Sequence, residues 1–276
     1  MTLSHAQGDC MRIGNRWRRR RQRSERRWRA RPVVASAVVA AGLTTTGEGR
    51  RPSSDPRLIA EMQLSQDLDA AIAAAEGGDE RRADDLLESA VQRAQRAGAH
   101  AGVLAALDVR ATLAQRRGDA AEAESLAKYA LAFALCRLGL PRDHPEVLSW
   151  LLKLARLYSE QRRHEEAESA FQRCEALCRP HALPSLLPAA HRALAVLWVS
   201  VLFWHGYFLV GRQRFSEAAA KLEESYRAAL CAPAASTVPE QRLVILFHLA
   251  DALHRLGRYT DAIRSADCCG PYHVLP

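Results

Sequence analysis

Residues 151–174 read LLKLARLYSEQRRHEEAESAFQRC, and this stretch decides the fold because its pattern recurs along the chain. It carries small side chains at Ala155, Ala167 and Cys174, which are twelve and seven residues apart. Larger apolar residues fill the spaces between them at helical intervals. Small residues in this register allow two antiparallel helices to cross closely, since a bulky side chain would force their backbones apart. The stretch therefore predicts one helix–turn–helix unit.

The same register occurs five times when the alanine early in each second helix is taken as the anchor. The anchors are Ala83, Ala123, Ala167, Ala218 and Ala262. A small residue stands twelve positions before each anchor: Ala71, Ala111, Ala155, Gly206 and Ala250. Seven positions after the anchors stand Ala90, Ala130, Cys174, Ser225 and Cys269, which are also small. No pair can bury both of its faces alone, so neighbouring pairs must stack into a superhelix with a concave groove. The register favours tetratricopeptide repeats over a generic alanine-rich bundle.

The sequence predicts an all-α fold, a tetratricopeptide-repeat α-solenoid of about five helix pairs. Ala, Leu, Arg and Glu dominate and aromatic residues make up only 6%, so we expect almost no sheet. We expect a disordered Arg-rich leader over 1–57, a repeat domain over 58–269 and a non-helical tail over 270–276. The five pairs are expected at about 58–98, 100–138, 144–179, 186–231 and 238–269.

The turn inside each pair has a glycine signal in three of the five repeats. Five residues before the anchors stand Gly78, Gly118 and Gly257, where a helix end commonly needs the left-handed conformation. Arg162 and Gln213 occupy this position in the other two repeats. We expect those two turns to be strained or to have a different shape.

The net charge of the chain, +8, is concentrated in its leader. Residues 1–57 hold fourteen arginines and four acids, a net +10, so residues 58–276 carry −2. The repeat domain therefore implies no nucleic-acid partner. The Arg-rich, acid-poor leader is typical of a mitochondrial transit peptide. A nuclear-localisation cluster around Arg18–Arg21 and non-native upstream sequence are the alternatives.

An uncharged run of eighteen residues, Ala193–Val210, has the length of a membrane-spanning helix. The register places Gly206 at a small packing position, which favours a first helix buried between neighbouring pairs. A true span and contact with a membrane surface are the other interpretations.

No sequence motif indicates catalysis. The chain shows no phosphate-binding loop, nucleophile elbow or zinc-protease motif, so we expect no enzyme, no cofactor and no small-molecule substrate. Seven cysteines at irregular spacing do not suggest a disulfide framework. Cys174 and Cys178 with His181 lack a second pair of ligands, so we expect no metal site.

Function should therefore reside in the surface that holds other polypeptides. In this repeat type the first helices line the groove, at positions eight, eleven, fifteen and eighteen before the anchor. The candidate partner-binding residues are Asp108, Thr112, Gln115, Ser149, Arg156, Phe203, Tyr207, Phe247, Asp251 and His254. Aromatic side chains beside a few charges suit a peptide-holding groove. The alternative is that Phe203, Tyr207 and Phe247 pack against each other as core.

Two resemblances add to this interpretation. Asp143–Val147 followed by Leu154–Glu168 resembles the long tetratricopeptide repeats of kinesin light chains. Residues 62–265 resemble the mitochondrial tetratricopeptide repeat protein 19 family in their unequal repeat spacings, in Leu151–Tyr158 and in Phe208–Ala218. An Arg-rich leader precedes the repeats in this chain, as it does in the tetratricopeptide repeat protein 19 family.

The second resemblance implies a mitochondrial inner-membrane protein. Members of that family support biogenesis and upkeep of respiratory complex III and help to clear fragments of its Rieske iron–sulfur subunit, so these are the implied partners. The alternative is a cytosolic adaptor of the kinesin-light-chain kind. The family continues through further helices, whereas Gly270-Pro271 stops the last helix here. We therefore expect an uncapped solenoid end, explained by a truncated gene model or an alternative transcript.

Overall fold

The computed structural model describes residues 56–178, 189–231 and 239–267. Every regular element within these ranges is helical, as the all-α prediction requires. The predicted leader lies outside them apart from residues 56 and 57, and the predicted tail lies outside them entirely.

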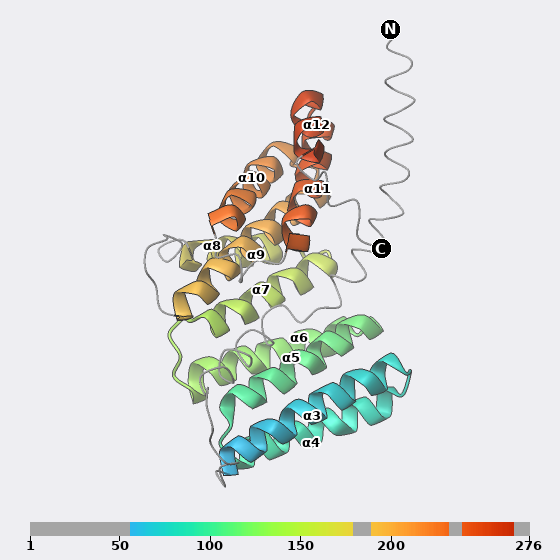
Figure 1. Cartoon of the computed structure of the whole chain (residues 1–276), viewed down its shortest axis with the longest axis vertical. Coiled ribbons are helices and arrows are strands. Elements are labelled where there is room, and N and C mark those ends of the chain that lie inside the picture. The colour runs from blue at the N-terminus through green and yellow to red at the C-terminus, as the bar shows by residue number, and fades with distance from the viewer. Residues whose placement is uncertain (1–55, 179–188, 232–238, 268–276) are drawn as a thin grey trace.

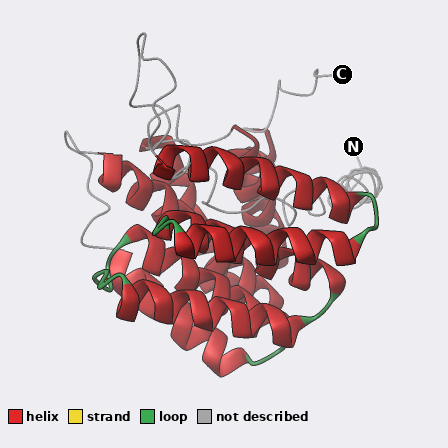
Figure 2. Ribbon diagram, turned by 90° about the horizontal axis from the view of Figure 1, so that it is seen from below, coloured by secondary structure: helices red, strands yellow, loops and turns green. Residues whose placement is uncertain are grey.

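The helices of the described ranges follow one another as five antiparallel pairs stacked in a row (Figure 1). The pairs are α3 (Pro56–Glu76) with α4 (Glu80–Arg96), α5 (His100–Arg117) with α6 (Ala120–Ala132), α7 (Pro145–Glu160) with α8 (His164–Cys178), α9 (Ala189–Gly211) with α10 (Phe215–Cys231), and α11 (Pro239–Arg255) with α12 (Tyr259–Asp267). A π-helical turn, η1 (Phe133–Arg137), extends α6. Short loops join the two helices of a pair (Figure 2).

The turns inside the five pairs share one shape. Gly78, Gly118 and Gly257 have φ angles of 84°, 85° and 75°. Arg162 and Gln213 adopt the same left-handed conformation, with φ of 61° and 62°. The expectation of a different shape is therefore wrong for these two turns. The expectation of strain applies, because a residue with a side chain is unfavourable at positive φ.

The ten predicted packing positions lie at helix crossings, and all but Ala250 are buried. Ala250 is half-buried. At Gly206 the crossing leaves no room for a side chain, since a Cβ atom there would lie 2.8 Å from Cγ of Leu222 on α10. Glycine therefore allows α9 to lie against α10.

The core changes in composition at α7, which contributes to both large clusters. From α3 to α7 the buried residues are mainly alanine, with Val147, Trp150 and Leu157 of α7 closing the end. From α7 to α12 the core contains large aromatic side chains: Phe171, Trp198, Phe203, Trp204 and Phe208. Helix α7 therefore joins an alanine-rich half of the stack to an aromatic-rich half.

Helix α9 fills the centre of the aromatic-rich core. Its segment Ala193–Gly211 is long and apolar enough to cross a bilayer by length and composition, with a mean hydropathy of 1.9, and 72% of it is buried in the fold. It packs against α7, α8, α10 and α11. These helices account for its apolar side chains, as the register predicts.

A row of ion pairs links successive repeats along one edge. The acid that directly follows each of the first three anchors pairs with an arginine of the next repeat: Asp84–Arg117 at 2.6 Å, Glu124–Arg163 at 2.7 Å and Glu168–Arg214 at 2.6 Å. In the fourth repeat this position holds Ala219, which is only 3% exposed. We call the positions one after and three before each anchor the inter-repeat row.

Candidate functional site

The first helices α3, α5, α7, α9 and α11 form the surface on which the sequence places the partner-binding residues. Helix α3 packs on α5, α7 packs on α9, and α9 packs on α11, whereas the second helices α4, α6, α8 and α10 each lie between two first helices. Contact between successive first helices places them on the inner side of the superhelix. We call this surface the first-helix face.

Asp108 and Thr112 on α5 are brought together by Lys153 of α7. The Lys153 ammonium donates to Asp108 Oδ1 at 2.5 Å, to the Asp108 carbonyl oxygen at 2.9 Å and to Thr112 Oγ1 at 2.9 Å. Burial lowers the pKa of Lys153, and the neighbouring Asp108 carboxylate opposes that shift. These polar groups therefore join α5 to α7, and their hydrogen bonds are made within the chain.

The sequence reasoning missed Lys153. Its signal is a cation within the apolar run Leu151–Tyr158, which contains one other charged residue, Arg156. Gln115 makes a similar link between the same helices, because its Nε2 donates to Glu160 Oε2 at 2.5 Å.

Ser149 and Glu146 occupy the first turns of α7 on the same part of the face. The Ser149 hydroxyl donates to the Glu146 carbonyl oxygen at 2.9 Å. Burial, followed by the nearby negative charge of Asp108, raises the pKa of the Glu146 carboxyl. This section of the face is therefore acidic at Asp108 and Glu146, with Lys153 as counter-charge.

Arg156 and Phe203 are buried rather than open to a ligand. Arg156 is 7% exposed, and its guanidinium carbon lies 3.9 Å from the centre of the Trp204 ring. Such stacking is a cation–π contact. Phe203 is 2% exposed, so the core interpretation applies to it. Both residues hold α7, α9 and α11 together.

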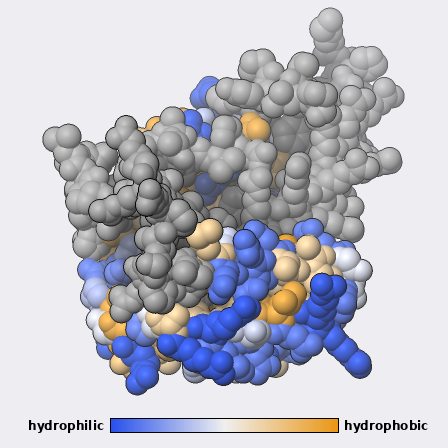
Figure 3. All heavy atoms as spheres, turned by 60° about the horizontal axis from the view of Figure 1, so that its bottom comes forward, coloured by the Kyte–Doolittle hydropathy of each residue, from blue (hydrophilic) through white to orange (hydrophobic). Residues whose placement is uncertain are grey.

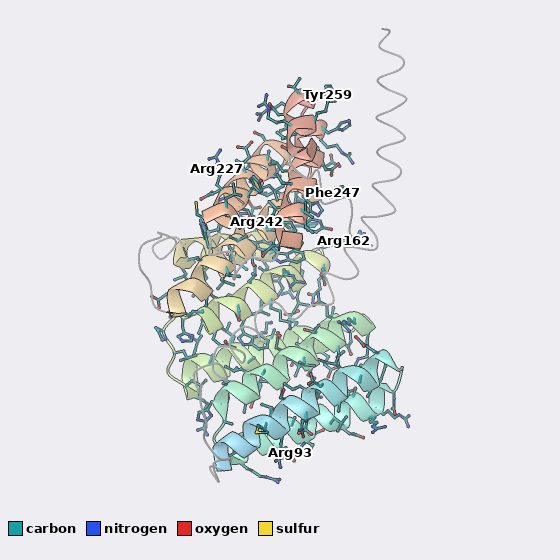
Figure 4. The ribbon with its side chains drawn as sticks, in the orientation of Figure 1. Arg93, Arg162, Arg227, Arg242, Phe247 and Tyr259 are labelled. Carbon is teal, nitrogen blue, oxygen red and sulfur yellow. The ribbon has the colours of Figure 1, made fainter. Side chains whose placement is uncertain are left out.

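Tyr207 is half-buried, and its ring meets His248 of α11 edge-on at 4.9 Å. Phe247 and Asp251 are also half-buried, and His254 is exposed. On α11 these three are spaced by four and three residues and so share one side of the helix. We call Tyr207, Phe247, Asp251 and His254 the α9–α11 patch. It is the part of the predicted set that combines aromatic rings with accessible polar groups, and Figure 4 labels Phe247 within it.

A buried polar network connects α8, α9 and α10 behind this patch. His205 Nδ1 lies 2.6 Å from Glu175 Oε1, and the Lys221 ammonium donates to Glu175 Oε2 at 2.5 Å. Burial favours the neutral acid, but the hydrogen bonds from His205 and Lys221 outweigh it and lower the pKa of Glu175. The ring of His205 also stacks on Phe171 at 5.3 Å. This network fixes three helices and was not predicted from the sequence.

The cysteine pair considered as a metal site is buried in α8. Burial raises the pKa of the Cys178 thiol to about 12 and raises that of Cys174 further. His181 lies outside the described residues. Within the described ranges no three His, Cys, Asp or Glu side chains gather as a metal site would require.

Comparison with known proteins gives similarities of three kinds: to a family model, to a curated protein and to solved structures. A family model described as "Tetratricopeptide repeat" matches residues 151–181. "Tetratricopeptide repeat protein 19, mitochondrial" of Danio rerio is 30% identical over 190 residues, which cover 66% of this chain and 46% of that protein. The chain thus spans about half the length of this curated relative.

Among solved structures, the putative kinesin light chain repeats of Podosopora anserina are similar with a TM-score of 0.53 at 21% identity, covering 74% of this chain and 92% of that one. BtubC (BKLC) from P. vanneervenii is similar with a TM-score of 0.63 at 18% identity, covering 88% and 95%. At these identities the structures show the fold alone.

These findings confirm the predicted fold and both resemblances. The chain is a tetratricopeptide-repeat superhelix, similar in sequence to mitochondrial tetratricopeptide repeat protein 19 and in fold to kinesin light chain repeats. Such repeats are typical of scaffold proteins that bind other proteins.

Proposed function

We propose that this chain is a non-enzymatic mitochondrial scaffold that holds a segment of a partner polypeptide on its first-helix face. The observation that carries the proposal is the 30% identity to the mitochondrial relative across 190 residues. The partners we propose are subunits of respiratory complex III, including the Rieske iron–sulfur protein, and the location is the inner membrane. The role is support of complex III assembly and maintenance, including clearance of Rieske fragments.

The α9–α11 patch supports a peptide-holding role. It contains the half-buried rings of Tyr207 and Phe247, the half-buried carboxylate of Asp251 and the exposed imidazole of His254. Aromatic anchors beside polar groups are what binding hot spots in protein interfaces consist of. The Asp251 carboxylate already lies 3.6 Å from Arg255 on its own helix, so we propose the two aromatic side chains as the principal anchors.

The leader supports mitochondrial import. Residues 1–32 hold eleven arginines and two acids, the composition of a transit peptide. A tagged full-length chain should be found in mitochondria with its N-terminus cleaved. Cytosolic residence with an intact N-terminus would instead favour the second candidate, a cytosolic adaptor, which the kinesin-light-chain fold similarity supports.

Affinity purification from mitochondria tests the partner. The wild-type chain should recover complex III subunits, and Phe247→Ala should reduce that recovery because it removes an aromatic anchor worth about 2 kcal/mol. Arg227→Ala is the control, since Arg227 lies on α10 (Figure 4) and 76% of its side chain is exposed. Equal recovery by both variants would remove the α9–α11 patch from the proposal, and failure of the wild type to recover complex III would remove the partner.

Tyr207→Ala separates binding from packing. Because Tyr207 is half-buried against His248, the change should lower both stability and recovery. A loss of stability with unchanged recovery would show that Tyr207 belongs to the core alone.

A further inference from the structure

The junction between the second and third repeats is built differently from its neighbours. Within the described ranges α3 packs on α5, α7 on α9 and α9 on α11, whereas α5 and α7 are not packed closely on each other. Long side chains cross this junction instead. Lys153 of α7 reaches Asp108 and Thr112 of α5. Gln115 of α5 reaches Glu160 of α7. On the first-helix face the two repeats are therefore joined through polar side chains, without close packing of the helices.

The second-helix side of the same junction is apolar and closely packed. Helix α6 and the π-helical turn η1 both pack on α7. Val147, Trp150 and Leu157 of α7 are at most 2% exposed and belong to the same core cluster as Phe133 of η1. Apolar contacts are non-directional, so they tolerate a small rotation that would break a hydrogen bond. This side is therefore suited to be an axis of rotation.

The ion pair at the edge of this junction is shared with its neighbours. Glu124, the acid of the inter-repeat row, meets Arg163 here, as Asp84 meets Arg117 and Glu168 meets Arg214. The row therefore does not distinguish the three junctions. The contacts of Lys153 with α5 do distinguish this one, and we call Lys153, Asp108 and Thr112 the α5–α7 bridge.

The covalent connection at this junction is also longer than the one before it. Residues 138–144 join η1 to α7, whereas residues 97–99 join α4 to α5. The longer connection includes Gly139, which has a φ of 62°. Hinges are commonly a few loop residues that absorb changes in backbone angle. The connection therefore restrains the angle between the two repeats less than a tight turn would.

The α5–α7 bridge is buried, and this gives it two distinct states. The side chains of Lys153 and Asp108 are 11% and 16% exposed. When the bridge is made, the ammonium has three oxygen acceptors. When the junction opens on this side, water replaces the lost partners of both charged groups. The attraction within a buried ion pair largely offsets the cost of removing its charges from water, so the two states differ little in free energy.

The α3–α6 half is attached to the rest of the described chain through this junction. Helices α3 and α4 pack on each other and on α5, and α6 packs on α5, η1 and α7. The α3–α4 end of the molecule is mostly hydrophilic (Figure 3). A change of angle at the junction therefore moves this half as one body, without exposing a large apolar surface at its outer end.

We propose that the junction between the second and third repeats is a hinge and that the α5–α7 bridge is its latch. With the bridge made, the described helices form one continuous superhelix. With the bridge released, the α3–α6 half rotates about the contact of α6 and η1 with α7. The α5 part of the first-helix face then moves relative to the α9–α11 patch. The inference concerns the stack itself and does not depend on which polypeptide the face binds.

Distances between two spin labels in the full chain test the hinge by pulsed electron paramagnetic resonance. Labels on non-natural amino acids at Glu88 of α4 and Arg227 of α10 report across the junction. Labels at Glu165 of α8 and Arg227 report within the aromatic-rich half. All three positions are exposed, and this labelling leaves the native cysteines unmodified.

Lys153→Met removes the ammonium and keeps an unbranched side chain. It should at least about double the width of the Glu88–Arg227 distance distribution and leave the Glu165–Arg227 distribution unchanged. Asp108→Asn combined with Lys153→Met leaves no buried charge and should broaden the Glu88–Arg227 distribution in the same way. Both variants should keep the helical circular dichroism spectrum.

Arg214→Met is the matched control. It removes a cation that pairs with the preceding repeat at 2.6 Å, but at a junction where α7 packs directly on α9. Both distance distributions should therefore keep the wild-type width in this variant.

Three results would overturn the proposal. A wild-type Glu88–Arg227 distribution in both bridge variants would show that the apolar contacts of α7 alone fix the angle. Equal broadening of the Glu165–Arg227 distribution, or equal broadening by Arg214→Met, would show general loosening instead of rotation at one junction. Loss of the helical circular dichroism spectrum in both bridge variants would show that the bridge is required for folding and is not a latch.

Discussion

At the scale of single residues, Arg162 and Gln213 carry backbone strain that three other repeats avoid. Both are exposed and have positive φ angles near 60°, where glycine is favoured. Arg162→Gly and Gln213→Gly should each raise the free energy of unfolding by about 0.5–1 kcal/mol, measured by urea denaturation.

Gly118→Ala is the reciprocal change at φ 85° and should destabilise the chain by about 1 kcal/mol. If the two glycine variants were less stable than the wild type, contacts of the replaced side chains would outweigh the strain.

Gly206 tests the close crossing of α9 and α10. A Cβ atom there would lie 2.8 Å from Leu222 Cγ, so Gly206→Ala should lower the free energy of unfolding by about 1–3 kcal/mol. Gly211→Ala on the same helix is the matched control, because a Cβ atom at Gly211 meets nothing within 4 Å. A lower melting temperature for Gly211→Ala than for Gly206→Ala would contradict the crossing geometry.

At the scale of helices, Glu124 joins α6 to the turn between α7 and α8. It receives hydrogen bonds from Arg163 at 2.7 Å and Gln161 at 3.0 Å and pairs with Lys128 at 2.6 Å. Burial alone would raise its pKa, but these three partners lower the pKa of Glu124 to about 2. The link between the second and third repeats therefore requires the ionised carboxylate.

The pH dependence follows from the direction of this shift. A carboxyl whose pKa is lower in the folded chain stabilises the fold above its usual pKa of 4.5, and the stabilisation is lost as pH falls toward 2. The difference in unfolding free energy between wild type and Glu124→Gln should therefore shrink between pH 5 and about 3. Glu165→Gln, an exposed neighbour on α8, serves as the control. A difference that stayed constant with pH would show that Glu124 acts through its shape and not its charge.

The sequence predicts the helix pairs well because their packing is local. Small residues at fixed distances from each anchor determine where two helices of one pair cross, as Ala155 and Gly206 illustrate. Contacts between pairs are harder to predict, because they depend on the rotation from one repeat to the next. Lys153 meets Asp108 from 45 residues away, and His205 meets Glu175 from 30 residues away. The same rotation buries Arg156 against the Trp204 ring. The register alone places Arg156 on the open face.

At the scale of the whole molecule, the stack has two unlike ends. The α3 end presents Gln63 and Gln66 to solvent, and the α12 end presents Tyr259 and Ile263. A first helix packs better on an apolar preceding helix than on a polar one, so the two described ends differ in the surface that they present. This difference between the two ends can be predicted from the sequence once the register is known, since it follows from the residue types at equivalent positions.

The change in core composition at α7 has a consequence for amide hydrogen exchange. Alanine side chains bury less apolar surface than phenylalanine or tryptophan, so the α3–α6 half gains less free energy per residue from burial. We expect the amides of α3 and α4 to exchange through local openings of low free energy. The amides of α9 should exchange only when the whole chain unfolds. Since α7 is shared by both clusters, its amides should open at an intermediate free energy. The molecule would then respond to mild denaturant by fraying from its N-terminal pairs while the aromatic half keeps its native protection.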